Sequence, residues 1–167
     1  IDSVEAIRTE KAIKLFEEFG VYTRTELESR AEIEYEAYSK TVNIEAKTML
    51  SMMKKTFLPS VLSYCKELAE TAAKTKAILP DAPISAESKL LEKLSGLYTE
   101  ISEKTEALAE AEKAAESMED TIEKVTYFHY TILAKMDDLR SSVDTAEALI
   151  PDSFLPYPTY DELLFSV

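Results

Sequence analysis

Glycine and tryptophan are scarce in this chain of 167 residues, which has two glycines and no tryptophan. Sheet-rich folds and phosphate-cradling loops need glycine for their tight turns, so the scarcity counts against both. The one cysteine, Cys65, excludes an intramolecular disulfide and fits the reducing conditions of the cytoplasm. The one histidine, His129, excludes a di-metal helical bundle, because that site needs a Glu-x-x-His pair on each of two helices.

Basic residues are also few: 19 Lys and Arg stand against 32 Asp and Glu, which gives a net charge of −13. Nucleic acids and anionic membrane surfaces both require a basic face, so neither is an expected partner. No apolar run approaches the roughly 18 residues of a membrane-spanning helix, and no signal peptide opens the chain. We therefore expect a cytoplasmic location, and the start at Ile1 instead of methionine suggests a segment of a longer polypeptide.

What the chain has in abundance is an apolar repeat. Between Leu90 and Ile150, alternating steps of four and three residues fall on apolar side chains at every position except Lys104 and His129. Such a repeat places one apolar seam along a helix, and the seam must be buried against another helix. With abundant Ala, Glu, Lys and Leu, it predicts an all-α fold built as a long antiparallel helical hairpin or bundle.

Start and stop signals define the first expected helices. Gly20 is a natural helix end, because glycine adopts the left-handed conformation that closes a C-terminus, and it predicts a short helix over residues 3–19. Thr23 and Glu26 form a capping box, in which each side chain satisfies a backbone amide of the other residue. The box predicts a long helix over residues 24–79, with the short helix packed on the bundle that this helix forms.

Prolines mark the next expected breaks in the helices. Pro59 lies inside the long helix, removes one backbone donor and predicts a kink near Thr56. The segment 80–83 contains two prolines and predicts a short loop that returns the chain antiparallel. The heptad segment then predicts a nearly continuous helix over residues 86–150, with a bend at 117–120 as the alternative.

We expect one domain over residues 1–167 that ends in a different kind of segment. Residues 151–167 are rich in proline and aromatic side chains, which predicts an extended tail. A tail so apolar should dock on the bundle, on a neighbouring domain or on another subunit. The residues expected to make that contact are Tyr157, Tyr160, Leu163, Leu164 and Phe165.

No catalytic, cofactor-binding or metal-binding constellation is evident. The chain has no Gly-x-Ser-x-Gly elbow, no phosphate loop and no Cys-x-x-Cys pair, and its many carboxylates have the spacing of solvated helix faces. His129 falls on the seam, where a half-buried histidine bonded to Tyr or a carboxylate is expected, with a pH sensor or metal ligand as the alternative. Cys65 is expected to be an inert thiol, with Cys–His catalysis as the alternative.

Several stretches together resemble one family, in matching order and spacing along essentially the whole chain. The blocks Glu26-Leu27-Glu28-Ser29-Arg30 and Pro156 to Phe165 are the most specific of them. The chain resembles the C-terminal region of type III glutamine synthetases, the long-chain bacterial form of the enzyme, although Leu155 stands where that family usually has Trp. The other matching stretches are Lys11 to Phe16, Gly20 to Thr23, Tyr38, Asn43 to Ala46, Leu58-Pro59, Tyr64, Leu139-Arg140 and Val143-Asp144.

The resemblance implies a non-catalytic helical appendage that supports oligomer assembly, subunit contacts or regulation. The parent enzyme would join ammonia to glutamate with ATP and Mg or Mn, and its catalytic residues would belong to an upstream domain. Expected partners are therefore that catalytic domain and neighbouring subunits, with self-association of the hairpin as a further expectation. A stand-alone helical tether or sensor that merely shares the heptad is the alternative.

Overall fold

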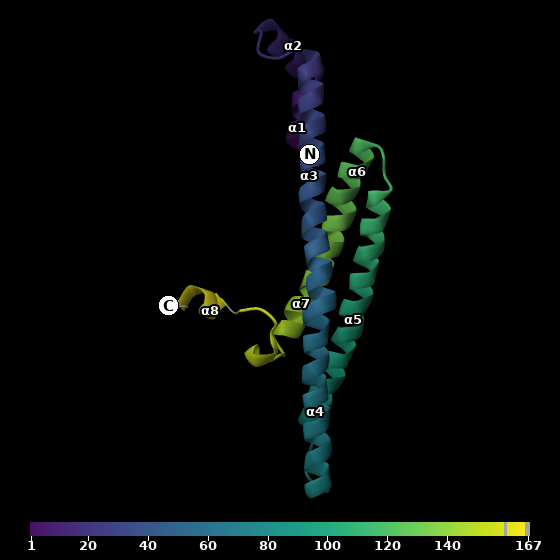
Figure 1. The fold of residues 1–167 in the computed structure, drawn as a ribbon, viewed down its shortest axis with the longest axis vertical. Coiled ribbons are helices and arrows are strands. Elements are labelled where there is room, and N and C mark those ends of the chain that lie inside the picture. The colour runs from purple at the N-terminus through teal and green to yellow at the C-terminus, as the bar shows by residue number, and fades with distance from the viewer. Residues whose placement is uncertain (159, 166–167) are drawn as a thin grey trace. The chain divides into compact units, whose positions relative to one another are not determined.

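The structure, a computed structural model, describes residues 1–158 and 160–165; for Tyr160 and Asp161 it describes only the backbone. The described residues form helices and connecting loops and contain no β-strand (Figure 1). The predicted all-α fold class is therefore confirmed.

Contacts within the chain group it into two compact units. The first unit comprises Ile1–Lys47 with Glu110–Ala134, and the second comprises Thr48–Ala109 with Lys135–Val167. Three helices, α3 (Arg24–Met52), α5 (Ser85–Glu116) and α7 (Leu133–Glu147), continue from one unit into the other without interruption. Each unit contains segments from both halves of the sequence.

The first unit begins with two short helices, α1 (Asp2–Ile7) and α2 (Glu10–Glu18). The single helix expected over residues 3–19 is wrong, because Thr9 ends one helix and starts the other. The Thr9 hydroxyl donates to the Ala6 carbonyl at 2.9 Å and accepts from the Ala12 amide at 3.3 Å, as an N-cap does.

The junction between α2 and α3 has the expected chemistry. Gly20 has a φ of 63°, in the left-handed region that closes helices. The Thr23 amide donates to Glu26 Oε2 at 2.8 Å, and the Glu26 amide donates to Thr23 Oγ1 at 3.3 Å. The capping box is confirmed.

An apolar cluster holds the first unit together. Ala31 and Tyr35 of α3 pack with Val125 of α6, and Ile1 and Val4 cover this cluster. The N-terminal segment therefore packs on the longer helices, as predicted.

The long helix continues past α3 through a π-helical turn, η1 (Met53–Phe57), into α4 (Leu58–Ile78). Pro59 falls in the first turn of α4, so the π turn lies where the proline was expected to disturb the helix. A proline has no N–H and its ring crowds the preceding turn, and a wider turn accommodates both effects. The Thr56 hydroxyl donates to the Met52 carbonyl at 2.6 Å within this turn.

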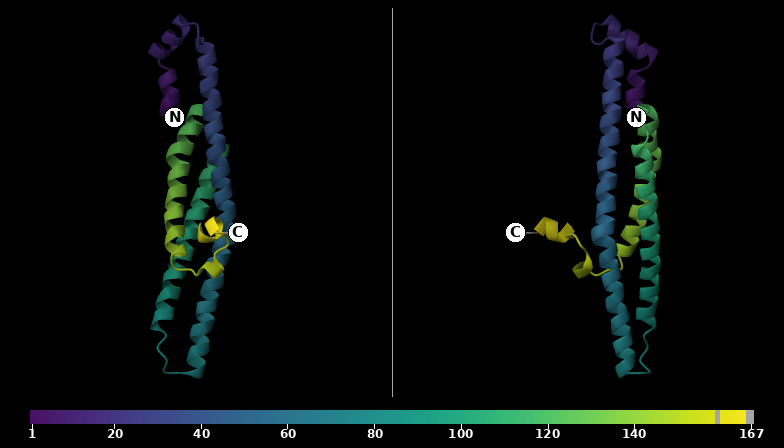
Figure 2. Two further views of the ribbon diagram at one scale, coloured as in Figure 1. Left: turned by 90° about the vertical axis from the view of Figure 1, so that its left-hand side faces the viewer. Right: turned by 45° about the vertical axis from the view of Figure 1, so that its right-hand side comes forward.

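In the second unit, α4 and α5 form an antiparallel hairpin (Figures 1 and 2). The loop between Ile78 and Ser85 contains both prolines of the expected turn. The hairpin is confirmed. Its buried side chains include Val61 on α4 and, on α5, Leu94, Ile101 and Leu108, which are three positions of the predicted apolar repeat.

The nearly continuous helix expected over residues 86–150 is wrong, and the break lies at the alternative position. Helix α5 ends at Glu116, and α6 (Thr121–Tyr127) begins after residues 117–120. Asp120 is the N-cap: its Oδ1 accepts from the Glu123 amide at 2.7 Å. A π turn, η2 (Phe128–Ile132), and helix α7 (Leu133–Glu147) follow.

After the break, the buried side chains depart from the predicted apolar repeat at Ile122 and at Phe128. Ile122 is a seam position in the pattern but is 46% exposed, whereas Phe128 is off the pattern and is buried. Val125 and Ile132 remain buried on either side of Phe128. The seam therefore continues after the break with Phe128 in place of the expected His129.

The C-terminal tail differs from the extended segment that was expected. After a 3₁₀ turn, η3 (Asp152–Phe154), the chain is extended at Leu155 and then forms a short helix, α8 (Tyr160–Phe165). Leu163, Leu164 and Phe165 are three consecutive apolar residues, which supply helix-compatible side chains beyond the prolines of the tail.

The helices α3 and α5 that run through both units lead to a prediction about the single domain expected from the sequence. We expect the 167-residue chain to unfold in one cooperative transition, because neither unit can melt without breaking a continuous helix. Differential scanning calorimetry tests this: the calorimetric and van't Hoff enthalpies should agree. Two separable transitions would mean that each unit is a domain of its own.

Candidate functional site

The tail residues predicted to dock fall into two groups, and the first contacts the second unit itself. The Tyr157 ring stacks on Phe57, with ring centroids 6.5 Å apart and an interplanar angle of 11°. Its hydroxyl donates to Glu147, and the pKa of Tyr157 is raised by burial and, after that, by this carboxylate. Tyr157 is thus an internal anchor of the tail.

Phe154 provides a second internal contact of the tail. Its ring lies 5.1 Å from that of Tyr64 on α4, and its carbonyl accepts from the Ser60 hydroxyl. Both contacts reach the face of α4 that follows the π turn. The start of the tail therefore packs on the second unit, in agreement with its apolar character.

The second group is exposed. Leu163, Leu164 and Phe165 on α8 are 60%, 73% and 75% exposed, and Figures 1 and 2 show α8 directed away from the hairpin. The side chain of Tyr160 lies outside the described residues. We refer to Leu163, Leu164 and Phe165 as the α8 apolar patch.

The two polar residues of the predicted seam have specific partners. In the second unit, Lys104 Nζ donates to Asp138 Oδ1 at 2.8 Å and to Ser142 Oγ at 2.7 Å. The hydrogen bond that Lys104 donates to Asp138 is the first cause that raises the pKa of Lys104. In the first unit, Tyr38 Oη and His129 Nδ1 are 2.7 Å apart. The expected bond from His129 to a tyrosine is confirmed.

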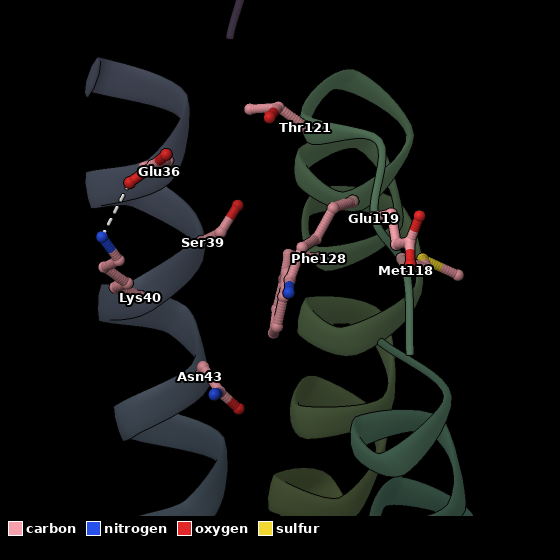
Figure 3. Close-up of a pocket in the computed structure, with 9 residues that line it drawn as sticks. Glu36, Ser39, Lys40, Asn43, Met118, Glu119, Thr121 and Phe128 are labelled. Carbon is pink, nitrogen blue, oxygen red and sulfur yellow. Dashed lines mark hydrogen bonds and ion pairs between the residues drawn. The ribbon is translucent and has the colours of Figure 1, made fainter. Parts of the chain in front are cut away.

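A polar cavity of about 330 Å³ lies within the first unit, between α3 and α6 (Figure 3). One wall is a face of α3, and the other is the loop before α6 together with α6 and the start of η2. Its lining residues are Glu36, Ser39, Lys40 and Asn43 on the first wall, and Met118, Glu119, Thr121, Lys124 and Phe128 on the second.

Two polar atoms at this cavity are buried without a hydrogen-bond partner among the described residues. They are Ser39 Oγ and Asn43 Oδ1, and Ser39 is 6% exposed. Figure 3 shows both side chains directed from α3 towards the facing helix. Sequence analysis missed this site; the available signal was polar residues at spacing i, i+4 beside the apolar stripe of α3.

Charged groups of both signs line the cavity. Lys40 Nζ and Glu36 Oε2 form an ion pair at 2.8 Å, which lowers the pKa of Glu36. Lys124 lowers that pKa further through its charge, although it contributes less than Lys40 does. The side chains of Lys124 and Glu119 form no hydrogen bond or ion pair with any residue that the structure describes.

The remaining candidates for chemistry are few. Within residues 1–158 and 160–165, no group of three or more His, Cys, Asp or Glu side chains is arranged to hold a metal ion. Cys65 is half-buried, and burial raises the pKa of its thiol, which disfavours the reactive thiolate. Among the helices of the described part, none combines the length and apolar character that a bilayer span requires.

The orphaned Ser39 hydroxyl gives a stability prediction. Ser39→Ala should raise the free energy of unfolding by about 1 kcal/mol, because a buried polar group without a partner is destabilising. Ser63→Ala is the matched control: it is also a helical serine, but its hydroxyl is exposed and donates to the Pro59 carbonyl. Urea unfolding of both variants measures the difference, and a loss of stability only in Ser39→Ala would show that its hydroxyl has a partner.

Comparisons with known proteins found sequences that are similar to part or most of this chain. A sequence profile described as the glutamine synthetase C-terminal domain matches residues 1–76. A glutamine synthetase of Butyrivibrio fibrisolvens is 38% identical over 95% of this chain and 23% of its own length. A type-3 glutamine synthetase of Dictyostelium discoideum is 28% identical over 98% of this chain and 23% of its own length. A glutamine synthetase of Bacteroides fragilis is 29% identical over 87% of this chain and 21% of its own length.

The chain spans less than a quarter of the length of these relatives. The family resemblance drawn from the sequence blocks agrees with the profile match and with the type-3 relative. The chain therefore belongs to the glutamine synthetase family, as a C-terminal helical domain of the type III group.

Proposed function

We propose that this domain is a non-catalytic structural element of a glutamine synthetase subunit and that it supports oligomer assembly through its C-terminal tail. The observation that carries the proposal is the α8 apolar patch, in which three adjacent large apolar side chains are each at least 60% exposed. Burying a Leu or Phe side chain contributes about 1.5–3 kcal/mol. A patch of three such residues therefore favours a partner surface over solvent.

The internal anchor supports this proposal. Tyr157 stacks on Phe57 and bonds to Glu147, so the tail is fixed to the second unit a few residues before the α8 apolar patch. A fixed starting point reduces the conformational entropy that a docking segment loses on binding. The patch is thus presented for contact with the upstream catalytic domain or with a neighbouring subunit.

We propose further that the parent protein makes glutamine from glutamate, ammonia and ATP with a divalent metal. The supporting fact is that the relatives named glutamine synthetase are about four times as long as this chain. Their additional length leaves room for a catalytic domain that supplies the ATP and metal ligands. No residue of this domain is assigned a catalytic role.

Replacing two apolar side chains of the α8 apolar patch with charged ones tests the docking role. In the full-length protein, Leu164→Asp with Phe165→Asp should raise the dissociation constant of the subunit contact at least a hundredfold, because burying these side chains is worth about 3–6 kcal/mol together. Mass photometry measures the oligomer population. Ile78→Asp with Leu79→Asp is the matched control, since this adjacent apolar pair at the hairpin loop is also exposed, at 78% and 61%.

An effect of the same size in both double variants would contradict a specific role of α8. No change of oligomer mass in the Leu164→Asp, Phe165→Asp protein would contradict the docking role itself.

Removal of the whole domain tests the assembly role. Deleting residues 1–167 from the full-length protein should break the oligomer, and the rate of glutamine formation should fall with it. Native mass measurement and a glutamine assay are made on the same preparation. An intact oligomer with an altered response to substrate would instead assign the helices to regulation, and an unchanged oligomer and rate would mean that the domain serves another partner.

A further inference from the structure

An exposed apolar face lies on the short helix α2, which Figure 1 shows at the start of α3. Leu15 and Phe19 are four residues apart, so they lie on one face of α2, and Val21 follows two residues later. Each of the three side chains is more than half exposed. We refer to Leu15, Phe19 and Val21 as the α2 apolar patch.

The helix that presents this patch already has its own buried side. Ile13 is 2% exposed, and its position two residues before Leu15 places it on the opposite side of α2. Packing within the first unit therefore uses the Ile13 side and leaves the α2 apolar patch in solvent. Clustered large apolar side chains at a surface are typical of an interaction site.

Contacts with the start of α3 hold α2 in place. Arg24 Nη2 donates to Glu10 Oε2 at 2.9 Å. The Tyr22 ring lies 5.8 Å from the Phe16 ring, and the Arg30 guanidinium carbon lies 4.5 Å from the centre of the Tyr22 ring. A helix fixed in this way loses less conformational entropy on binding than a free segment does.

The charges beside the patch are self-complementary. Lys11 and Glu18 are seven residues apart, so they lie on the same flank of α2, next to Leu15. Both side chains are exposed, and neither forms a hydrogen bond or an ion pair with any residue in the described part of the chain. If two copies of α2 pack antiparallel about a two-fold axis at Leu15, Lys11 of each copy lies opposite Glu18 of the other.

This pairing favours a second copy over a partner of a single charge sign. An acidic partner surface would face Glu18 with a like charge, and a basic one would do the same to Lys11. The net charge of −13 opposes the approach of two copies, so self-association requires opposite charges to be paired locally. The flank of α2 provides that pairing twice, once on each side of the axis.

We propose that the α2 apolar patch is a self-association surface that binds the α2 apolar patch of a second copy of the full-length protein. The contact is isologous: Leu15 lies at the two-fold axis, and the Lys11–Glu18 pairs lie along one edge. Three apolar side chains per copy make a far smaller contact than the 20–30 residues per side of a standard interface. It therefore acts between copies that other contacts hold at high local concentration.

Disulfide formation between copies tests the position of the axis. Leu15→Cys in the full-length protein, oxidised with copper phenanthroline, should give a covalent dimer on a denaturing gel, because a residue at a two-fold axis meets its own counterpart. Leu62→Cys on α4 is the matched control, since Leu62 is also more than half exposed. Leu15→Cys should give at least tenfold more covalent dimer than Leu62→Cys, and the unmodified protein corrects for native cysteines.

Charge exchange tests the antiparallel orientation. Lys11→Glu and Glu18→Lys, each combined with Leu15→Cys, should each lower the dimer yield about fivefold, because like charges then meet on both sides of the axis. The variant that carries both reversals should regain the yield, since every pair again joins a lysine and a glutamate. The two side chains are exposed, so the reversals leave the packing of α2 intact.

Three results would overturn the proposal. The first is an equal dimer yield from Leu15→Cys and Leu62→Cys, which would mean that random collisions form the disulfide. The second is a yield that stays low when both charges are reversed, which would mean that Lys11 and Glu18 do not face each other between copies. The third is a Leu15→Cys thiol that does not react with a maleimide in the native protein and forms no dimer, which would mean that another part of the full-length protein covers the patch. None of these results depends on the role of the α8 apolar patch.

Discussion

Burial of one apolar seam along each long helix is the constraint on which the rest of the structure depends. Helices of this length are not stable in isolation through propensity alone, and most of their stability comes from packing an apolar face. Fully buried side chains such as Val61, Leu94 and Ile101 in the second unit, and Ala31 and Val125 in the first, supply that face. The two polar residues of the predicted repeat both have partners, Lys104 with Asp138 and His129 with Tyr38.

The helix ends that rest on local chemistry were predictable from the sequence. Gly20 and the Thr23–Glu26 box define the start of α3, because turn conformation and capping involve only residues close in the chain. Asp120 is likewise a capping residue, but the apolar repeat continues past it, and the repeat alone predicts a continuous helix. In the structure Asp120 is the N-cap of α6, and the helix is broken there.

The π turns and the cavity could not be predicted for a different reason. A π turn depends on how packing on both sides of it fits together, so η1 and η2 leave almost no local signature apart from Pro59. Likewise, the contact of Ser39 and Asn43 with a cavity depends on a helix some eighty residues away in the sequence. The apolar composition of the α8 apolar patch is evident from the sequence, whereas the inward role of Tyr157 depends on its contacts with Phe57 and Glu147.

The anchoring of Tyr157 also limits where the α8 apolar patch can reach. Phe165 lies eight residue steps after Tyr157. A fully extended chain spans at most about 3.3–3.6 Å per residue, so the patch stays within roughly 29 Å of the anchor. Confinement to a sphere of this radius gives a tethered segment an effective concentration in the millimolar range. A surface within that radius is therefore engaged as an intramolecular event, largely independent of protein concentration, and a surface beyond it cannot be engaged at all.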